Sequence, residues 1–229
     1  MPDFADAGRS KLITRVDALA RRLAALDLDV LKPAELANEV RGLSKRAEIF
    51  AMTQPVEFGG TGAGAFDLAT VRDELAARDV AGLPGIFGPG PGVLANVEGR
   101  LRTDFLEPQL AGELRPAFGF TEPDDALRHT WAAVDGDHLV VNGQKSYVTG
   151  GGDADFINTL VHVDDVGPAM VVIETNRPGV TLTRRFGSLD GSHHAAFSFD
   201  DVRVPKDQIV GAPGKGLNRA LDQVTAVRM

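Results

Sequence analysis

Two runs decide the fold of this 229-residue chain: Phe118-Gly119-Phe120-Thr121-Glu122-Pro123, and then Asn142-Gly143-Gln144-Lys145-Ser146-Tyr147-Val148-Thr149. Upstream of the first run, apolar residues recur at the spacing of helices, whereas around and beyond the second they alternate as in strands. The two runs therefore mark the junction between a helical part and a strand-rich part. Binding sites form preferentially at such junctions, because clefts form where domains meet.

The composition excludes several classes of function. The chain has no cysteine, which rules out disulfides, thiolate catalysis and cysteine-ligated metals. A net charge of −8 argues against a nucleic-acid partner, which would require a basic face. No apolar run approaches the ~20 residues that span a membrane, and acids among the N-terminal arginines are untypical of a transit peptide. We therefore expect a cytoplasmic protein without a membrane or nucleic-acid partner.

The N-terminal half has the apolar period of helices. Leu12, Val16, Leu19 and Leu23 form one stripe, and the same spacing recurs further along the chain. We expect helices over residues 9–27, 36–50, 66–79, 92–98 and 101–111.

From Thr130 the period changes to two. Asp135-Gly136 lies between two apolar runs and predicts a hairpin over residues 131–141, and Asn142-Gly143 predicts the next turn. Further strands are expected at 156–163, 169–175, 179–185, 194–199 and, as a short edge piece, 202–204. Short strands joined by turn signals are typical of a barrel or a sandwich. Because a helical pattern restarts at Leu217, the order of elements predicts an α+β fold with segregated domains.

Several motifs have a simpler structural interpretation. The glycine-rich loop Glu57–Gly64 has part of the spacing of a dinucleotide fingerprint, but a predicted helix precedes it where that fingerprint requires a strand. Gly214-Lys215-Gly216 lacks the Ser or Thr of a phosphate loop and is interpreted as a linker. His193 and His194 are adjacent on a predicted strand and point to opposite faces, so we expect no metal site there.

Thr121-Glu122-Pro123 followed by Tyr147-Val148-Thr149 resembles the acyl-CoA dehydrogenase family. The resemblance covers nearly the whole chain, because further motifs follow in the family's order: Glu57–Gly60, Phe105–Pro108, Ala111–Glu113, Asn142–Lys145, Pro178–Val180, Phe199–Pro205 and Gly211–Gly216. It implies an N-terminal all-α helical domain over residues 1–115, a central β-barrel over 116–212 and, at 213–229, the start of a truncated C-terminal helical domain.

The resemblance also implies a cofactor and a reaction. FAD would lie between the barrel and the C-terminal helices, and an acyl-CoA or related acyl thioester would be dehydrogenated between its α and β carbons. The residues carried over as cofactor-binding are Phe118, Phe120, Thr121, Tyr147, Val148 and Thr149. Tyr147 stands where the family usually has tryptophan, and Arg228 matches an arginine on the substrate side.

The chain departs from the family pattern at three places. The loop after Pro123 is short and carries Asp124 and Asp125, which would repel a phosphate. The C-terminal bundle is absent, and Val227 stands where some members carry the catalytic base, so the catalytic residue is unknown. Three explanations stay open: a fragment of a full enzyme, a subunit of a homo- or hetero-oligomer whose partner supplies the bundle, or a non-catalytic interaction module.

Overall fold

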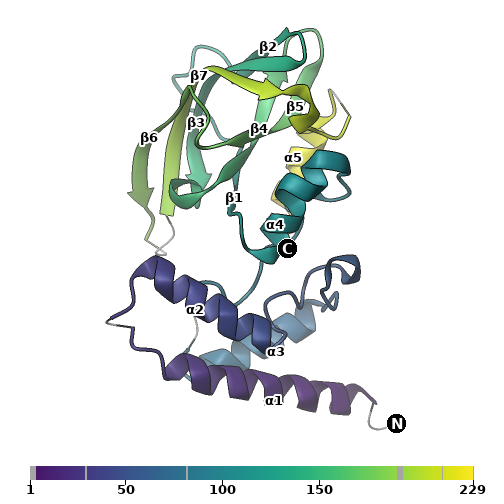
Figure 1. The fold of residues 1–229 in the computed structure, drawn as a ribbon, viewed down its shortest axis with the longest axis vertical. Helices are drawn as coiled ribbons and strands as arrows, with labels where there is room; N and C mark the ends of the chain where they lie inside the picture. The colour runs from purple at the N-terminus through teal and green to yellow at the C-terminus, as the bar shows by residue number, and fades with distance from the viewer. Residues whose placement is uncertain (1–3, 29, 81, 190–192, 213, 229) are drawn as a thin grey trace. The chain divides into compact units, whose positions relative to one another are not determined.

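The computed structural model describes residues 4–28, 30–80, 82–189, 193–212 and 214–228 (Figure 1). The chain divides into two compact units, Met1–Gly90 and Pro91–Met229. The regular elements described in the first unit are helices, and the second unit carries a β-sheet with a few helices. The protein is therefore of mixed α/β type.

The described residues of the first unit form three α-helices and one short 3₁₀ turn: α1 (Phe4–Ala24), α2 (Pro33–Arg46), η1 (Val56–Phe58) and α3 (Ala65–Ala76). α1 packs against both α2 and α3 (Figure 1). The predicted apolar stripe of α1 is buried here together with side chains of the other elements, namely Leu12, Val16, Leu19, Ala20, Leu23, Val40, Leu43, Ile49, Met52, Val71, Leu75, Val80 and Ile86.

The bounds of α2 follow from local backbone chemistry. The helix begins with Pro33, and the Glu35 carboxylate accepts a hydrogen bond from the Lys32 N–H at 3.0 Å. Its predicted continuation to Phe50 is wrong: α2 ends at Arg46, and Glu48 adopts a left-handed backbone with φ of 57°. Phe50 is nevertheless only 3% exposed, which explains why it continued the apolar stripe in the sequence.

The described residues of the second unit form six helical segments besides the sheet: η2 (Gly92–Leu94), η3 (Leu101–Leu106), α4 (Glu107–Ala111), η4 (Gly151–Asp153), η5 (Lys206–Gln208) and α5 (Gly216–Arg228). The helix predicted at 101–111 is present, but its first six residues form a π-helix. Pro108 has no N–H to donate to the preceding turn, and the Glu107 N–H reaches back to the Arg102 carbonyl. α5 packs against strands β4 and β5 of the sheet.

The sheet has eight strands: β1 (Pro116–Gly119), β2 (Trp131–Asp135), β3 (His138–Thr149), β4 (Phe156–Val163), β5 (Gly167–Glu174), β6 (Val180–Gly187), β7 (His193–Pro205) and β8 (Ile209–Val210). Their order is β6-β7-β3-β2-β4-β5-β8, with β1 added beside β4. The core of the second unit lies against one face of this sheet. It includes Leu139, Val141, Val148, Ile157, Val161, Val171, Ala195, Phe197 and Val202.

β1 and β2 pair with successive parts of β4. β1 pairs in parallel with residues 156–159, and β2 pairs in parallel with residues 162–163. Residues 120–130 therefore connect β1 to β2, and these two strands pair one after the other with β4. The first of the two sequence runs, Phe118–Pro123, begins in β1 and continues into this connection.

The predicted hairpin at Asp135-Gly136 is confirmed by the pairing of β2 with β3. The turn predicted at Asn142-Gly143 is wrong, because β3 continues through both residues with a bulge. The Asn142 side chain instead exchanges two hydrogen bonds of 3.0 Å with Asp201 on β7. The piece predicted at 202–204 is part of β7, so it is no separate strand.

No helix in the described part of the chain is both long and apolar enough to cross a lipid bilayer. Within the same residues, no group of three or more histidine, aspartate or glutamate side chains could hold a metal ion. Along the chain, the boundary between the two compact units falls between Gly90 and Pro91. The predicted domain limits at 115/116 and 212/213 stay predictions.

Candidate functional site

A main-chain hydrogen bond joins the two decisive runs. The Ser146 N–H on β3 donates to the Thr121 carbonyl at 3.0 Å. The loop after β1 is thereby held against the end of β3, where Tyr147, Val148 and Thr149 follow. The predicted cofactor-binding residues of the two runs are thus brought together.

Lys145 supports this junction from inside the fold. Its side chain is 1% exposed, and its ammonium group lies 2.7 Å from Oε1 of Glu122. The same ammonium group donates to the Phe120 carbonyl at 3.4 Å. Gly119 beside it has no room for a side chain, because a Cβ at that position would lie 2.9 Å from Cγ2 of Ile157. The lysine is therefore a structural cation for the loop.

Glu122 has two further partners in its own loop. The Thr130 N–H donates to Oε1 at 2.8 Å, and His129 Nδ1 lies 2.7 Å from Oε2. Burial raises the pKa of Glu122, but hydrogen bonds from Lys145, His129 and the Thr130 N–H outweigh it and lower the pKa to about 2. Burial lowers the pKa of Lys145, and the bond to Glu122 opposes that change. We conclude that the pair is ionised.

The low pKa of Glu122 decides its role. A general base works best when its pKa lies near the operating pH, because a weakly basic carboxylate holds a proton poorly. With a pKa of about 2 and three hydrogen-bond donors, Glu122 is a positioning carboxylate.

Tyr147 stands in an aromatic cluster at the end of β3. Its ring centroid lies 5.1 Å from that of Phe186 and 4.3 Å from that of His194. Its hydroxyl group lies 3.2 Å from the Ser188 hydroxyl. The side chain is still 48% exposed, so its ring is open to a planar ligand. Phe186, Ser188 and His194 were not predicted from the sequence, because they join Tyr147 only through sheet pairing.

Thr149 and Val148 have opposite orientations. The Thr149 hydroxyl lies 3.1 Å from Nδ1 of His194, which is 6% exposed and pairs with Thr149 across β3 and β7. The Val148 side chain is fully buried in the sheet core. Only the main chain of Val148 is therefore available to a cofactor. His193 is exposed, so the two histidines lie in different environments.

The first run contributes rings and free donors. The rings of Phe118 and Phe120 stack with centroids 5.9 Å apart, and both side chains are half-buried. In the described part of the chain, neither the N–H nor the hydroxyl of the exposed Thr121 has a hydrogen-bond partner. These groups, with the ring of Tyr147, fit a planar heteroaromatic ring that needs an apolar face and donors at its edge.

The loop that follows does not fit a pyrophosphate. Asp124 and Asp125 are exposed and would repel one. Arg128 is engaged elsewhere: it lies 2.9 Å from Asp164, and its guanidinium group lies 4.1 Å from the Trp131 ring centroid. Any phosphate groups of a cofactor must therefore find donors outside this loop. Of Arg228 only the backbone, at the end of α5, is described; its side chain lies outside the described residues.

Residues 117–202 match the family model of the acyl-CoA dehydrogenase middle domain. The acyl-CoA dehydrogenase FadE29 of Mycobacterium tuberculosis is 36% identical over 187 residues, which are 76% of this chain and 48% of that protein. The chain spans between 45% and 60% of the length of several such curated relatives.

Solved structures share the fold. The ChsE4-ChsE5 complex from Mycobacterium tuberculosis matches with a TM-score of 0.69 and 27% identity over 95% of this chain and 58% of that chain. A glutaryl-CoA dehydrogenase from Mycobacterium smegmatis, in complex with FADH2, matches with a TM-score of 0.71 and 24% identity over 97% of this chain and 60% of that chain. The second likeness concerns the fold alone.

Proposed function

Since the chain belongs to the acyl-CoA dehydrogenase family, we propose that it takes part in the FAD-dependent α,β-dehydrogenation of an acyl thioester, such as an acyl-CoA. The observation that carries the proposal is the hydrogen bond from Ser146 to Thr121. It holds the two sequence runs in one place, with the Thr121 donors and the Tyr147 ring both open to a ligand.

We assign the parts of the chain by this family. Residues 1–115 form its N-terminal all-α domain, residues 116–212 its central β-barrel, and residues 213–229 the start of its C-terminal helical domain. The eight-stranded sheet and the helices of residues 4–76 support this α+β assignment. A cytoplasmic location stays a prediction from the N-terminal sequence.

The residues of the site have separate roles in this proposal. Thr121 donates to the edge of the flavin ring, and Tyr147 covers one face of the ring and excludes water. The main chain of Val148 and the hydroxyl of Thr149 lie along the same ring, beside Phe118 and Phe120. When bound, FAD supplies the acceptor for the hydride that leaves the substrate. Arg228 is assigned to the substrate side.

A second function is favoured by two observations. The carboxylates of Asp124 and Asp125 stand where a phosphate-binding loop is expected, and Glu122 has too low a pKa to act as base. In the alternative the chain is a non-catalytic subunit or interaction module, and a homologous or identical partner chain completes the site. The solved ChsE4-ChsE5 structure is a complex, which supports an oligomeric arrangement for this chain.

The visible spectrum of the purified protein tests the proposal. The protein is isolated with any chain that co-purifies, saturated with FAD and then mixed with octanoyl-CoA under anaerobic conditions. Bound flavin that loses its visible absorption establishes a dehydrogenase. Flavin that binds and stays oxidised with a panel of acyl-CoA esters establishes the non-catalytic alternative. A protein that takes up no flavin, alone or with its partner, contradicts both.

A further inference from the structure

His194 is the one buried histidine among the five of this chain, all of which the structure describes. It lies near the start of β7, beside the candidate site, and is 6% exposed. Its imidazole ring carries two polar nitrogens, which a side chain that only fills space does not need. The proposed function gives this histidine no role.

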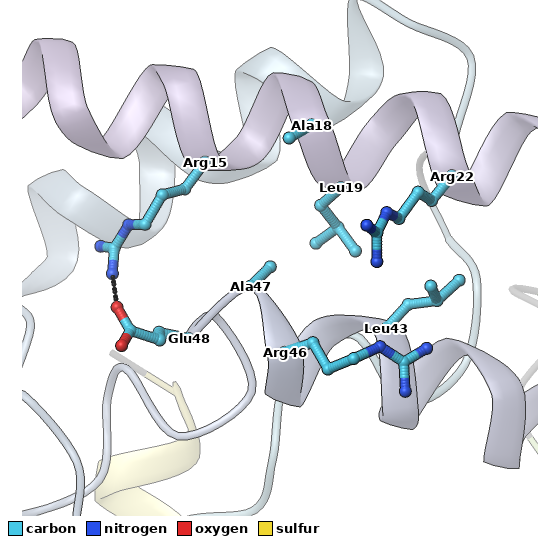
Figure 2. Close-up of a pocket in the computed structure, with 8 residues that line it drawn as sticks. All are labelled: Arg15, Ala18, Leu19, Arg22, Leu43, Arg46, Ala47 and Glu48. Carbon is cyan, nitrogen blue, oxygen red and sulfur yellow. Dashed lines mark hydrogen bonds and ion pairs between the residues drawn. The ribbon is translucent and has the colours of Figure 1, made fainter.

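Burial distinguishes this histidine from the arginines between α1 and α2 (Figure 2). Arg22 and Arg46 are exposed, and Figure 2 shows their guanidinium groups apart, with Leu43 between them. Arg15, on the same hollow, holds Glu48 at 2.7 Å. Water and one ion pair therefore account for these charges, whereas a buried imidazole needs partners within the protein.

Sheet pairing places His194 in a row across three strands. It lies opposite Thr149 on β3 and opposite Phe186 on β6. Ala195, the next residue on β7, is buried in the sheet core, so the side chain of His194 points to the other face. The histidine therefore lies on the outer face of the sheet, next to the exposed residue Thr149.

His194 contacts two of the predicted cofactor-binding residues at once. Its Nδ1 lies 3.1 Å from the hydroxyl oxygen of Thr149. Its ring centroid lies 4.3 Å from that of Tyr147, with an angle of 36° between the two ring planes. Thr149 and Tyr147 are both exposed, whereas the histidine that joins them is buried. One side chain thus supports a polar group and an aromatic ring of the candidate site.

The contact with His194 decides what the Thr149 hydroxyl offers to a ligand. A hydroxyl group has a single hydrogen, so Thr149 donates either to Nδ1 or to the ligand. If Nδ1 carries a hydrogen, it donates to Oγ1, and the hydrogen of Thr149 is left for the ligand. If Nδ1 is bare, Thr149 donates to it and presents only lone pairs. The state of Nδ1 therefore determines whether the site gains a donor or an acceptor.

We propose that His194 is a positioning residue of the candidate cofactor site, whose Nδ1–H donates to the Thr149 hydroxyl and thereby directs the hydroxyl hydrogen toward the ligand. This role rests on the proposed function, because the edge of an oxidised flavin ring presents carbonyl oxygens and ring nitrogens that accept hydrogen bonds. The second contact of the histidine, with the ring of Tyr147, restricts the orientation of that ring. The donor and the aromatic face are thus both prepared before the cofactor binds.

The affinity for FAD, measured by fluorescence quenching on the full protein with any chain that co-purifies, tests this role. His194→Phe keeps a ring beside Tyr147 and loses Nδ1. It is expected to weaken FAD binding about three- to tenfold, because the Thr149 hydroxyl is then no longer oriented. His194→Asn places an amide N–H near the position of Nδ1 and should bind FAD more tightly than His194→Phe. The matched control is His193→Phe, at the exposed neighbour on β7, which should bind within about twofold of the wild type.

Thr149→Val shows whether the histidine acts through the hydroxyl. If it does, adding His194→Phe should cost little further affinity, and the double variant should bind FAD within about twofold of Thr149→Val alone. Two losses that multiply would overturn the proposal. So would a His194→Phe variant that binds FAD more tightly than His194→Asn, because that order is expected of a side chain that only fills space.

The ¹⁵N chemical shift of His194 Nδ1 in the ligand-free wild type gives a readout that depends neither on flavin nor on the folding of a variant. We expect the shift of a nitrogen that carries a hydrogen. A nitrogen without hydrogen would mean that Thr149 donates to His194, which contradicts the proposal. A wild type that takes up no FAD refutes the proposed function itself, whereas wild-type affinity that His194→Phe leaves unchanged refutes only the role of His194.

Discussion

The ammonium group of Lys145 lies 2.7 Å from Oε1 of Glu122, although the lysine side chain is only 1% exposed. One residue comes from the middle of β3 and the other from the loop after β1. The ion pair therefore connects the two halves of the candidate site beneath its surface. Its removal should disturb the site and the stability of the fold together.

Lys145→Met should destabilise the protein strongly. Removing one partner of a buried ion pair leaves an uncompensated charge, which costs about 3–5 kcal/mol of unfolding free energy. Urea unfolding measures this loss. Lys206→Met, at an exposed lysine, is the control and should stay within about 0.5 kcal/mol of the wild type. The double variant Lys145→Met with Glu122→Gln should recover part of the loss; a purely additive result would show that the two charges are not coupled.

The pKa of Glu122 predicts a pH dependence. Folding lowers this pKa from about 4.5 to about 2, so the ionised carboxylate stabilises the fold fully above pH ~4.5 and loses that contribution as the pH falls toward ~2. The difference in unfolding free energy between the wild type and Glu122→Gln should therefore shrink as the pH is lowered. A difference that stays constant down to about pH 2.5 would contradict the ionised pair.

Gly143 is expected to tolerate no side chain. A Cβ at this position would lie 2.6 Å from Cα of Thr130, whose N–H donates to Glu122. Gly143→Ala should therefore lower the melting temperature and displace the loop of Glu122. Gly136→Ala is the matched control, because Gly136 also has positive φ but no atom within 4 Å of the added Cβ. The Gly136→Ala variant should lose only the free energy of backbone strain, about 1–2 kcal/mol. Equal decreases in melting temperature for the two variants would exclude the steric explanation.

Tyr147 should contribute to flavin binding through its ring. Tyr147→Ala is expected to weaken FAD binding about five- to tenfold, since an aromatic contact contributes about 0.5–1.5 kcal/mol beyond its buried area. Tyr147→Phe keeps the ring and loses only the contact with Ser188, so it should bind FAD within about twofold of the wild type. Fluorescence quenching of FAD measures both. Equal affinities for the alanine variant and the wild type would remove Tyr147 from the cofactor site.

Local signals predicted many of the elements. The Asp135-Gly136 hairpin is present, and β4 has the predicted limits 156–163, because each has its own turn or apolar signal. β1 was not predicted as a separate strand, since four residues are too few to show an alternating pattern. Gly143 was misread because a glycine at a bulge and a glycine in a turn look alike until the partner strand is known.

The sequence predicted only part of the candidate site. Its two runs were recognised, but the partners that hold them are distant along the chain. Lys145 and Glu122 are 23 residues apart, and Thr149 and His194 are 45 residues apart. Such contacts depend on strand register, which a single sequence does not reveal.

The end-to-end pairing of β1 and β2 along β4 has an evolutionary consequence. Each strand is anchored to β4 by its own hydrogen bonds, at residues 156–159 and 162–163. The segment between them can therefore gain or lose residues without shifting the register of the sheet. Insertions, deletions and charge reversals at residues 123–127 should therefore be nearly neutral for folding. This architecture allows a lineage to remodel the rim of its ligand site while the scaffold beneath stays unchanged.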